Sequence, residues 1–313
     1  MLERFLKQTS FESYEDFMQN YEVRVPANFN FAYDVVDAWA ETNPSKRAML
    51  WTNEDGEAHT FTFHDLKEYS DRTASYFQSI GIGKGDVVML ILKRRYEWWL
   101  CMLALHKLGA IVVPATHLLR KHDIEYRCKA ADIHTIVACG DIEIIHHVEA
   151  AKSYCPTLKN LVSIGEIIPK GWKDFHRGIN SAAPFISPER NDNTDTMLMY
   201  FTSGTSGYPK IATHTHKYPL GHFHTAKYWH NVDPDGLHFT ISDTGWAKAM
   251  WGKLYGQWLA EAAIFVYDFD RFDAAEILPM FAKHNITTFC APPTMLRMLI
   301  KQDISKYDLS SVK

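Results

Sequence analysis

Short apolar strands alternate with helices along the chain, and this alternation limits the possible folds more than any other feature. Segments 86–93 (DVVMLILK) and 110–115 (AIVVPA) are typical of buried strands, and residues 97–108, which stop at Gly109, are typical of a helix between them. The next helix and strand are expected at 123–131 and 134–139. Because strand, helix and strand in succession form a parallel sheet with helices on its faces, the sequence predicts an α/β fold.

A polar stretch interrupts the alternation near the middle of the chain. Residues 180–196 contain two prolines and few apolar side chains, so we expect a linker there. Before it, residues 47–63 resemble a hairpin and residues 63–80 a helix. After it, we expect strands at 197–202, 237–242, 263–268 and 286–291, and helices at 245–261, 274–284 and 294–302.

This arrangement predicts two α/β subdomains with largely parallel sheets flanked by helices. The first subdomain would cover residues 61–190. The second would cover residues 191–313 and be incomplete at its C-terminus, and residues 1–60 would form an N-terminal segment that packs on it.

The composition is that of a soluble globular protein, with 46% hydrophobic and 22% charged residues. A net charge of −4 provides no basic surface for a phosphodiester backbone, so we expect no nucleic-acid partner. The apolar runs are too short to span a bilayer, so we expect no membrane partner. Five scattered cysteines without a Cys-x-x-Cys pair, and an N-terminus without an apolar signal region, indicate a reducing compartment, and the cytoplasm is the expected location.

The stretch MLMYFTSGTSGYPK, residues 197–210, joins an apolar strand to a loop rich in small and hydroxyl residues. Glycines let the backbone approach a ligand closely, and successive N–H groups can converge on an anion. The loop contains Thr202, Ser203, Gly204, Thr205, Ser206, Gly207 and Lys210. Because Pro209 precedes Lys210, and Ile211 follows it, the loop is not a Walker A motif, which requires Gly-Lys-[Ser/Thr]. It predicts a different polyphosphate clamp, and a serine-rich surface turn is the alternative.

Residues 200–210 resemble the signature loop of the adenylate-forming (AMP-binding) superfamily, which reads approximately [YF]-T-S-G-[ST]-[TS]-G-x-P-K. This superfamily includes acyl-CoA synthetases, luciferases and peptide-synthetase adenylation domains. Segments 61–92, 103–119 and 239–268 are similar to other parts of the same family. The run Asp243-Thr244-Gly245-Trp246 most resembles the acetyl- and medium-chain acyl-CoA synthetase branch.

The resemblance implies that a carboxylic acid attacks the α-phosphorus of ATP, and that coenzyme A then displaces AMP from the acyl-adenylate. It implies that Thr202 and Lys210 are catalytic, and that the loop from Thr202 to Lys210 binds the phosphates and stabilises the departing pyrophosphate. Trp246 would form a wall of the acyl pocket, and Ala247 would leave room for an acid larger than acetate. The implied ligands are a small carboxylic acid, ATP, Mg²⁺ and coenzyme A.

Later motifs of the family do not occur before Lys313, among them the Tyr-Gly-x-Thr-Glu string whose glutamate helps to bind magnesium. We therefore expect an N-terminal fragment of a longer acid-thiol ligase, inactive alone, with the magnesium ligand elsewhere. Two alternatives remain open: an adenylation domain that loads a carrier protein, and a non-catalytic nucleotide-binding fragment. The sequence indicates neither the acid nor the oligomeric state.

Five histidines between residues 214 and 230 form two His-x-His pairs, a spacing that could ligate zinc: His214, His216, His222, His224 and His230. No cysteine or carboxylate lies in this segment, so we expect a helix with surface and half-buried histidines and assign no metal ligand. Trp98 and Trp99 are expected to pack in the core.

Overall fold

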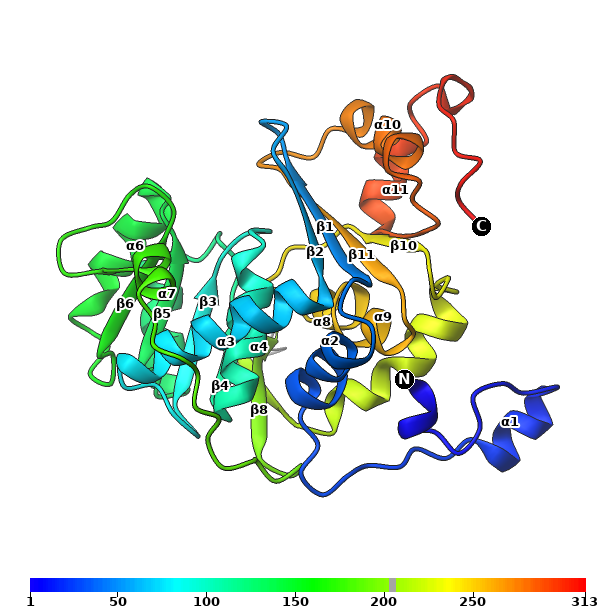
Figure 1. Ribbon diagram of the computed structural model, residues 1–313. Coiled ribbons are helices and arrows are strands. Elements are labelled where there is room, and N and C mark those ends of the chain that lie inside the picture. The colour runs from blue at the N-terminus through cyan, green and yellow to red at the C-terminus, as the bar shows by residue number, and fades with distance from the viewer. Residues whose placement is uncertain (203–206) are drawn as a thin grey trace.

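Two β-sheets organise the chain in the computed structural model, which describes residues 1–202 and 207–313 (Figure 1). One sheet has five strands in the order β12-β10-β11-β1-β2, and the other has seven in the order β7-β6-β5-β3-β4-β8-β9. All neighbouring strands run parallel except the hairpin pairs β1-β2 and β8-β9. The predicted α/β fold with largely parallel sheets is therefore observed.

The seven-stranded sheet is built from the alternation that the sequence predicts. Its strands are β3 (Val87–Ile91), β4 (Ile111–Pro114), β5 (Thr135–Cys139), β6 (Asn160–Ile164), β7 (Lys173–Asp174), β8 (Thr196–Thr202) and β9 (Lys210–Thr215). The helices that alternate with them are α3 (Phe63–Ser79), α4 (Glu97–Leu108), α5 (Lys121–Ala130), α6 (Ile142–Lys152) and α7 (Phe175–Asn180).

The five-stranded sheet combines the N-terminal hairpin with later strands. Its strands are β1 (Arg47–Asn53), β2 (Ala58–Thr62), β10 (Leu237–Thr240), β11 (Ala263–Asp268) and β12 (Thr288–Cys290). The helices of this part are α8 (Ala247–Gly252), α9 (Tyr255–Leu259), α10 (Ala274–His284) and α11 (Pro293–Leu299). The remaining helical segments are α1 (Tyr14–Asn20), α2 (Ala38–Thr42), η1 (Leu2–Arg4), η2 (Ala32–Asp37), η3 (Tyr218–His222), η4 (Thr225–Trp229) and η5 (Ile304–Lys306).

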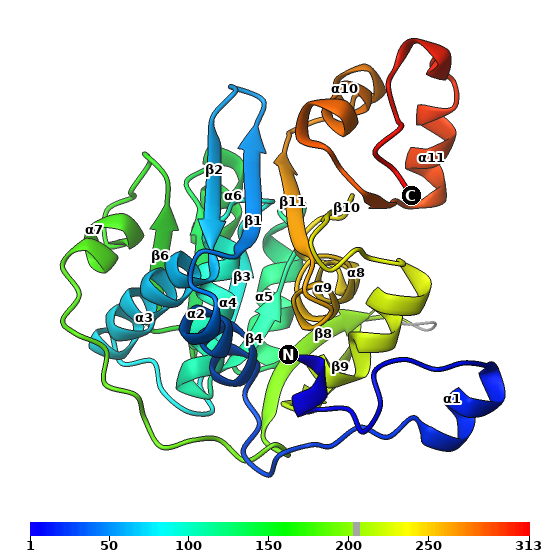
Figure 2. The same ribbon diagram turned by 45° about the vertical axis from the view of Figure 1, so that its right-hand side comes forward.

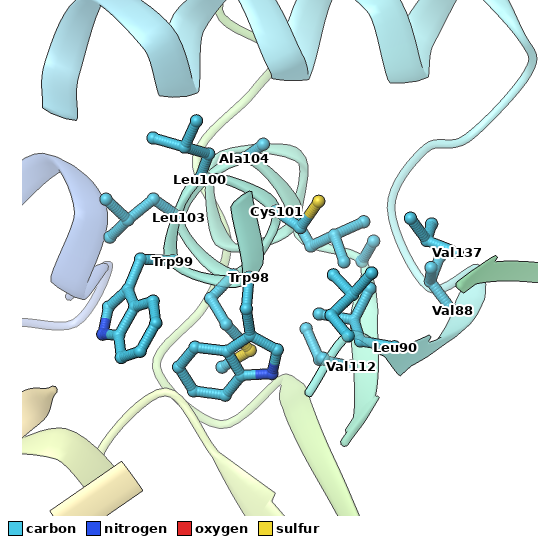
Figure 3. Close-up of a cluster of buried hydrophobic side chains, with 14 of the residues drawn as sticks. Val88, Leu90, Trp98, Trp99, Leu100, Cys101, Leu103, Ala104, Val112 and Val137 are labelled. Atoms are coloured by element: carbon cyan, nitrogen blue, oxygen red, sulfur yellow. The ribbon is translucent and has the colours of Figure 1, made fainter. Parts of the chain in front are cut away.

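Helix α4 forms the centre of the larger hydrophobic core. All of its residues are buried, and it ends where Gly109 takes the left-handed conformation, with φ of 66°. In Figure 3, Val88, Leu90 and Val112 of the seven-stranded sheet lie on one side of α4, and Trp99 lies on another. The prediction that Trp98 and Trp99 pack in the core is confirmed, because both side chains are fully buried.

The two sheets share this core. The same buried cluster contains Val88 and Val112 from the seven-stranded sheet and Trp51 and Val266 from the five-stranded sheet. A second cluster, which includes Phe239 of β10, lies under α10. Because the two sheets pack on one continuous core, the ends of their strands, and the loops attached there, are held in fixed positions.

The division of the chain between the two sheets differs from the predicted division near residue 190. Residues 181–195, all of which the structure describes, form no helix or strand, as expected of a linker. However, β8 and β9 follow this linker and join the seven-stranded sheet. The hairpin β1-β2, which belongs to the segment expected to pack on the second subdomain, pairs with β11. The three segments 1–60, 61–190 and 191–313 remain a prediction about domain organisation.

The single helix predicted at 245–261 is wrong, because α8 and α9 are separated at Lys253 and Leu254. The indole N–H of Trp99 donates to the backbone carbonyl of Lys253 at 2.9 Å. The helix therefore loses that carbonyl as an acceptor, and the side-chain nitrogen of Lys253 donates to the carbonyl of Ser242 at 2.7 Å instead of pointing to solvent. These contacts with α4 and with the segment after β10 overcome the local helical preference.

Candidate active site

The two ends of the predicted phosphate loop lie on a β-hairpin. Thr202 is the last residue of β8 and pairs with Lys210, the first residue of β9. The hydroxyl of Thr202 donates to the carbonyl oxygen of Lys210 at 3.3 Å, and Gly207 has a φ of 113°, which favours glycine. Both side chains are exposed at this end of the hairpin. The other predicted loop residues, Ser203, Gly204, Thr205 and Ser206, lie outside the described residues.

Tyr126 of α5 holds the segment that leads into β9. Its ring stacks on the ring of Tyr208, with centroids 4.7 Å apart and an interplanar angle of 18°. Its hydroxyl donates to the carbonyl oxygen of Pro209 at 2.7 Å. No local sequence pattern identifies Tyr126, because its position beside the loop depends on the packing of α5 against the sheet.

The run Asp243 to Trp246 forms a tight turn after β10. The N–H of Gly245 donates to the Asp243 carboxylate at 2.8 Å, and the N–H of Trp246 donates to the Asp243 carbonyl at 3.2 Å. A Cβ on Gly245 would lie only 2.1 Å from the backbone nitrogen of Thr116. Only glycine therefore allows this turn to approach the chain that follows β4 so closely.

The carboxylate of Asp243 carries the charge of this turn. His117 Nδ1 lies 3.0 Å from it, and the Arg94 guanidinium lies 3.7 Å from it. Burial raises the pKa of Asp243, but the hydrogen bonds from His117 and the Gly245 N–H outweigh burial and leave the pKa below its ordinary value. The ionised carboxylate therefore stabilises the turn at neutral pH.

Both predicted site segments adjoin the carboxyl end of β4. Strand β4 pairs with β8 through Val112 and Leu198. Thr116 lies four residues after Val112, and Thr202 lies four residues after Leu198. Thr116 also contacts the turn at Gly245. The described end of the loop at Thr202 and the turn before α8 are thus brought to one edge of the sheet, although Thr202 and Asp243 are 41 positions apart in the sequence.

Trp246 and Ala247 stand at the start of α8. Trp246 is 64% exposed, and Ala247 is also exposed. Their exposed side chains can contact a ligand at this edge of the sheet. Their role in an acyl pocket stays a prediction.

The segment with five histidines is not one helix, contrary to the prediction. His214 lies in β9, His222 ends the 3₁₀ turn η3, and His224 precedes η4. Residues 210–215 pair with β8 as the second strand of the hairpin, where a helix was expected. Within residues 1–202 and 207–313, no group of three or more His, Cys, Asp or Glu side chains could hold a metal ion.

The sequence of the chain matches a known protein family. Residues 36–313 match the family model described as "AMP-binding enzyme". The chain belongs to this family. The resemblance of residues 200–210 to the adenylate-forming signature is therefore confirmed at the level of the family.

Several curated relatives of this AMP-binding chain are acyl-coenzyme A synthetases. Human ACSM3 is 33% identical over 311 residues, which cover 97% of this chain and 53% of that protein. Mouse ACSM5 is 32% identical, with coverage of 92% and 51%, and human ACSM4 is 33% identical, with the same coverage. The chain thus spans about half the length of the curated relatives that it matches.

Solved structures with this fold include an acyl-CoA synthetase and a CoA ligase. The Brucella canis acyl-CoA synthetase aligns with a TM-score of 0.77 at 22% identity, covering 87% of this chain and 49% of that one. The anthranilate CoA ligase AuaEII, solved with anthranoyl-AMP, aligns with a TM-score of 0.82 at 23% identity, covering 92% and 55%. At this identity the likeness establishes the fold, and it confirms the predicted α/β class.

The prediction of a cytoplasmic location is wrong by the same comparison. The three relatives named above are all called mitochondrial. Separately, none of the helices in the described part of the AMP-binding chain combines the length and apolar character needed to cross a membrane.

Proposed function

We propose that the full-length protein is an AMP-forming acyl-CoA synthetase. It activates a carboxylic acid with ATP to give an acyl-adenylate and pyrophosphate, and the thiol of coenzyme A then displaces AMP to give a thioester. Membership of the AMP-binding family and the names of the relatives, acyl-coenzyme A synthetases, support this reaction.

One observation carries the proposal more than any other. Thr202 and Lys210 lie together at the carboxyl end of β8, next to β4, and the chain that follows β4 contacts the turn at Gly245. In open α/β sheets, ligands bind outside the carboxyl ends of the strands. A loop of this composition in this location fits a nucleotide phosphate better than it fits a surface turn.

The proposed roles follow from the chemistry of these residues. The ammonium group of Lys210 offsets the charge that develops on the departing pyrophosphate, and the hydroxyl of Thr202 donates a hydrogen bond to it. Trp246 and Ala247 border the apolar part of the acid.

Magnesium would accompany ATP and neutralise phosphate charge. The described residues contain no cluster of three or more potential ligands, so we assign no magnesium ligand and derive no step through the ion. Coenzyme A would supply the thiol that accepts the acyl group.

Pyrophosphate exchange in the full-length protein tests this function. Because Lys210 would act on the leaving group, Lys210→Ala should lower the ATP–pyrophosphate exchange rate about 100-fold. Lys217→Ala is the matched control, since Lys217 is an exposed lysine just after β9 and has no proposed role. Equal exchange rates in the two variants would refute the phosphate role of Lys210. Thioester formation with free coenzyme A, followed in parallel, tests the acceptor.

A further inference from the structure

His117 links the chain that follows β4 to the turn after β10. Its ring Nδ1 lies 3.0 Å from one carboxylate oxygen of Asp243, and the other carboxylate oxygen accepts the N–H of Gly245 at 2.8 Å. Because an ionised carboxylate can only accept hydrogen bonds, Nδ1 of His117 carries the hydrogen. Asp243 therefore joins the side chain of His117 to the backbone of the turn. Figure 2 shows β10 and α8, which this turn connects, below the C-terminal helices α10 and α11.

Two adjacent residues hold this turn from the side of β4. The backbone of Thr116 leaves no room for a Cβ on Gly245, which would lie 2.1 Å from the Thr116 nitrogen. The next residue, His117, bonds the carboxylate of Asp243. The contact with Thr116 limits how closely the turn approaches, whereas the bond from His117 fixes the direction of the carboxylate. The turn is thus held at two points, and the second depends on a side chain that can be exchanged.

Arg94 lies near the same carboxylate oxygen that His117 bonds. One of its guanidinium nitrogens is 3.7 Å from this oxygen, beyond hydrogen-bond distance, while another donates to the carbonyl of Phe269. Without the bond from His117, attraction to the guanidinium would draw the oxygen toward Arg94. The carboxylate would then rotate, and its second bond, to the N–H of Gly245, would weaken. The imidazole of His117 therefore selects one orientation of the Asp243 side chain.

The ring of His117 can be replaced without opening the core. Its side chain is 24% exposed, whereas that of Asp243 is 14% exposed. The ring lines a hollow of about 310 Å³ together with charged residues from neighbouring segments: Lys93, Arg120, Asp141, Glu143 and Asp270. Because this surrounding is polar and open to solvent, we expect a change at His117 to affect the turn more than the stability of the whole chain.

The conformation of Asp243 is passed on to Trp246. The N–H of Trp246 donates to the carbonyl of Asp243 at 3.2 Å, and the carbonyl of Trp246 accepts the N–H of Ala249 at 2.9 Å. Trp246 is thus the residue from which α8 begins, and its 64% exposed ring is oriented by the turn before it. A rotation of the Asp243 side chain would therefore displace this ring.

We propose that His117 is a positioning residue for acid binding, because it holds the turn at Gly245, and with it Trp246, through the carboxylate of Asp243. This inference rests on the proposed function, in which Trp246 borders the acid. His117 would perform this role without contacting the acid or ATP. The role requires a hydrogen-bond donor at the position of Nδ1, which the amide nitrogen of an asparagine can also supply.

Pyrophosphate exchange by the full-length protein, with the acid varied at saturating ATP, tests this role in His117→Leu and His117→Asn. Leucine fills a similar volume and donates no hydrogen bond, whereas asparagine keeps the donor. His64→Leu is the matched control, since His64 lies on α3 and also faces a carboxylate, that of Glu68 at 4.0 Å. The acid is the one that the wild type exchanges fastest among acetate, butanoate, octanoate and benzoate.

His117→Leu should raise the KM for the acid about tenfold and leave the KM for ATP unchanged, whereas His117→Asn and His64→Leu should stay within about twofold of the wild type. The inference is overturned if His117→Leu leaves the KM for the acid unchanged, if it raises both KM values equally, or if His117→Asn does not restore the wild-type value. A lower melting temperature with an unchanged KM for the acid, the pattern of a merely structural role, is included in the first of these outcomes.

Hydrogen–deuterium exchange of the same proteins without substrates gives a second measurement that needs no turnover. The amides of Gly245 and Trp246 should exchange about tenfold faster in His117→Leu than in the wild type, and at the wild-type rate in His117→Asn. Unchanged protection in His117→Leu would overturn the inference as well. A wild type that exchanges no pyrophosphate with any of the four acids, while protection still depends on His117, would contradict the proposed function and the role in acid binding, and would leave the bond to the turn intact.

Discussion

The hydroxyl of Tyr126 donates a hydrogen bond of 2.7 Å to the carbonyl oxygen of Pro209, one residue before the proposed phosphate-binding Lys210. The same tyrosine stacks on Tyr208. Helix α5 therefore fixes the backbone on the C-terminal side of the loop through one ring, which acts by positioning and does not itself reach the phosphates.

Removing this hydroxyl should impair ATP use without unfolding the protein. A hydrogen bond of this kind contributes about 0.5–1.5 kcal/mol, so Tyr126→Phe should raise the KM for ATP in pyrophosphate exchange about threefold to tenfold. Tyr126→Ala also removes the stacking on Tyr208 and should have a larger effect. Varying ATP at a saturating concentration of acid separates KM from kcat.

Tyr154→Phe serves as the control for this experiment, since Tyr154 follows α6 and is 47% exposed. A merely structural role of Tyr126 would lower the melting temperature and leave the KM for ATP of the folded enzyme unchanged. That pattern would contradict the positioning role.

The turn at Gly245 should tolerate no side chain. Because a Cβ there would lie 2.1 Å from the nitrogen of Thr116, Gly245→Ala must displace backbone and should reduce the free energy of unfolding by about 1–3 kcal/mol. Gly83→Ala is the matched control, since a Cβ there meets no atom within 4 Å. Urea unfolding of both variants measures the difference. Equal stabilities would show that the turn and the β4 end are not in tight contact.

Elements with strong local signals were predicted closely. The bounds of α4 and α10 agree with the predicted 97–108 and 274–284, because each helix ends at a residue in the left-handed conformation, Gly109 or Asn285. The hairpin of β1 and β2 was also predicted from its alternating pattern and its turn.

Elements and site residues that depend on distant contacts were not predictable in this way. The break between α8 and α9 depends on Trp99, which lies about 150 residues earlier in the chain. The loop could be identified because its composition is local. By contrast, Tyr126 and His117 join the site only through the order of strands β3, β4 and β8, which no local pattern specifies.

Lys107 should be among the residues that matter most for stability. Its ammonium group is fully buried and lies 2.6 Å from a carboxylate oxygen of Asp71 and 2.9 Å from one of Asp37. Burial raises the pKa of Asp37 to about 6 although Lys107 opposes that rise. Lys107→Met should therefore lower the free energy of unfolding by about 3–5 kcal/mol, because it leaves two carboxylates without their buried partner.

Lys67 provides a matched control for Lys107. It also pairs with Asp71, at 2.6 Å, but its side chain is 36% exposed. Lys67→Met should cost less than about 1 kcal/mol, as is usual for ion pairs at the surface. Urea unfolding at pH 7 compares the two variants directly. Similar losses from both would show that burial does not distinguish these ion pairs.

Lys253 should give the chain a distinctive dependence of stability on pH. Burial lowers its pKa from 10.5 to about 7, and the nearby Arg94 acts in the same direction. Between pH 7 and pH 10.5 the unfolded chain therefore holds a proton on Lys253 that the folded chain has lost. Because the unfolded state binds more protons in this window, the contribution of Lys253 to stability rises with pH there.

Lys253→Met removes this titration and keeps most of the apolar stem. The free energy of unfolding of the wild type minus that of the variant should increase by about 2 kcal/mol between pH 7 and pH 9. Urea unfolding of both proteins at pH 7, 8 and 9 measures this difference, in which groups that titrate equally in both proteins cancel. A difference that stays constant over this range would show that Lys253 keeps an ordinary pKa in the folded chain, and that its bond to the Ser242 carbonyl is made by an ammonium group throughout.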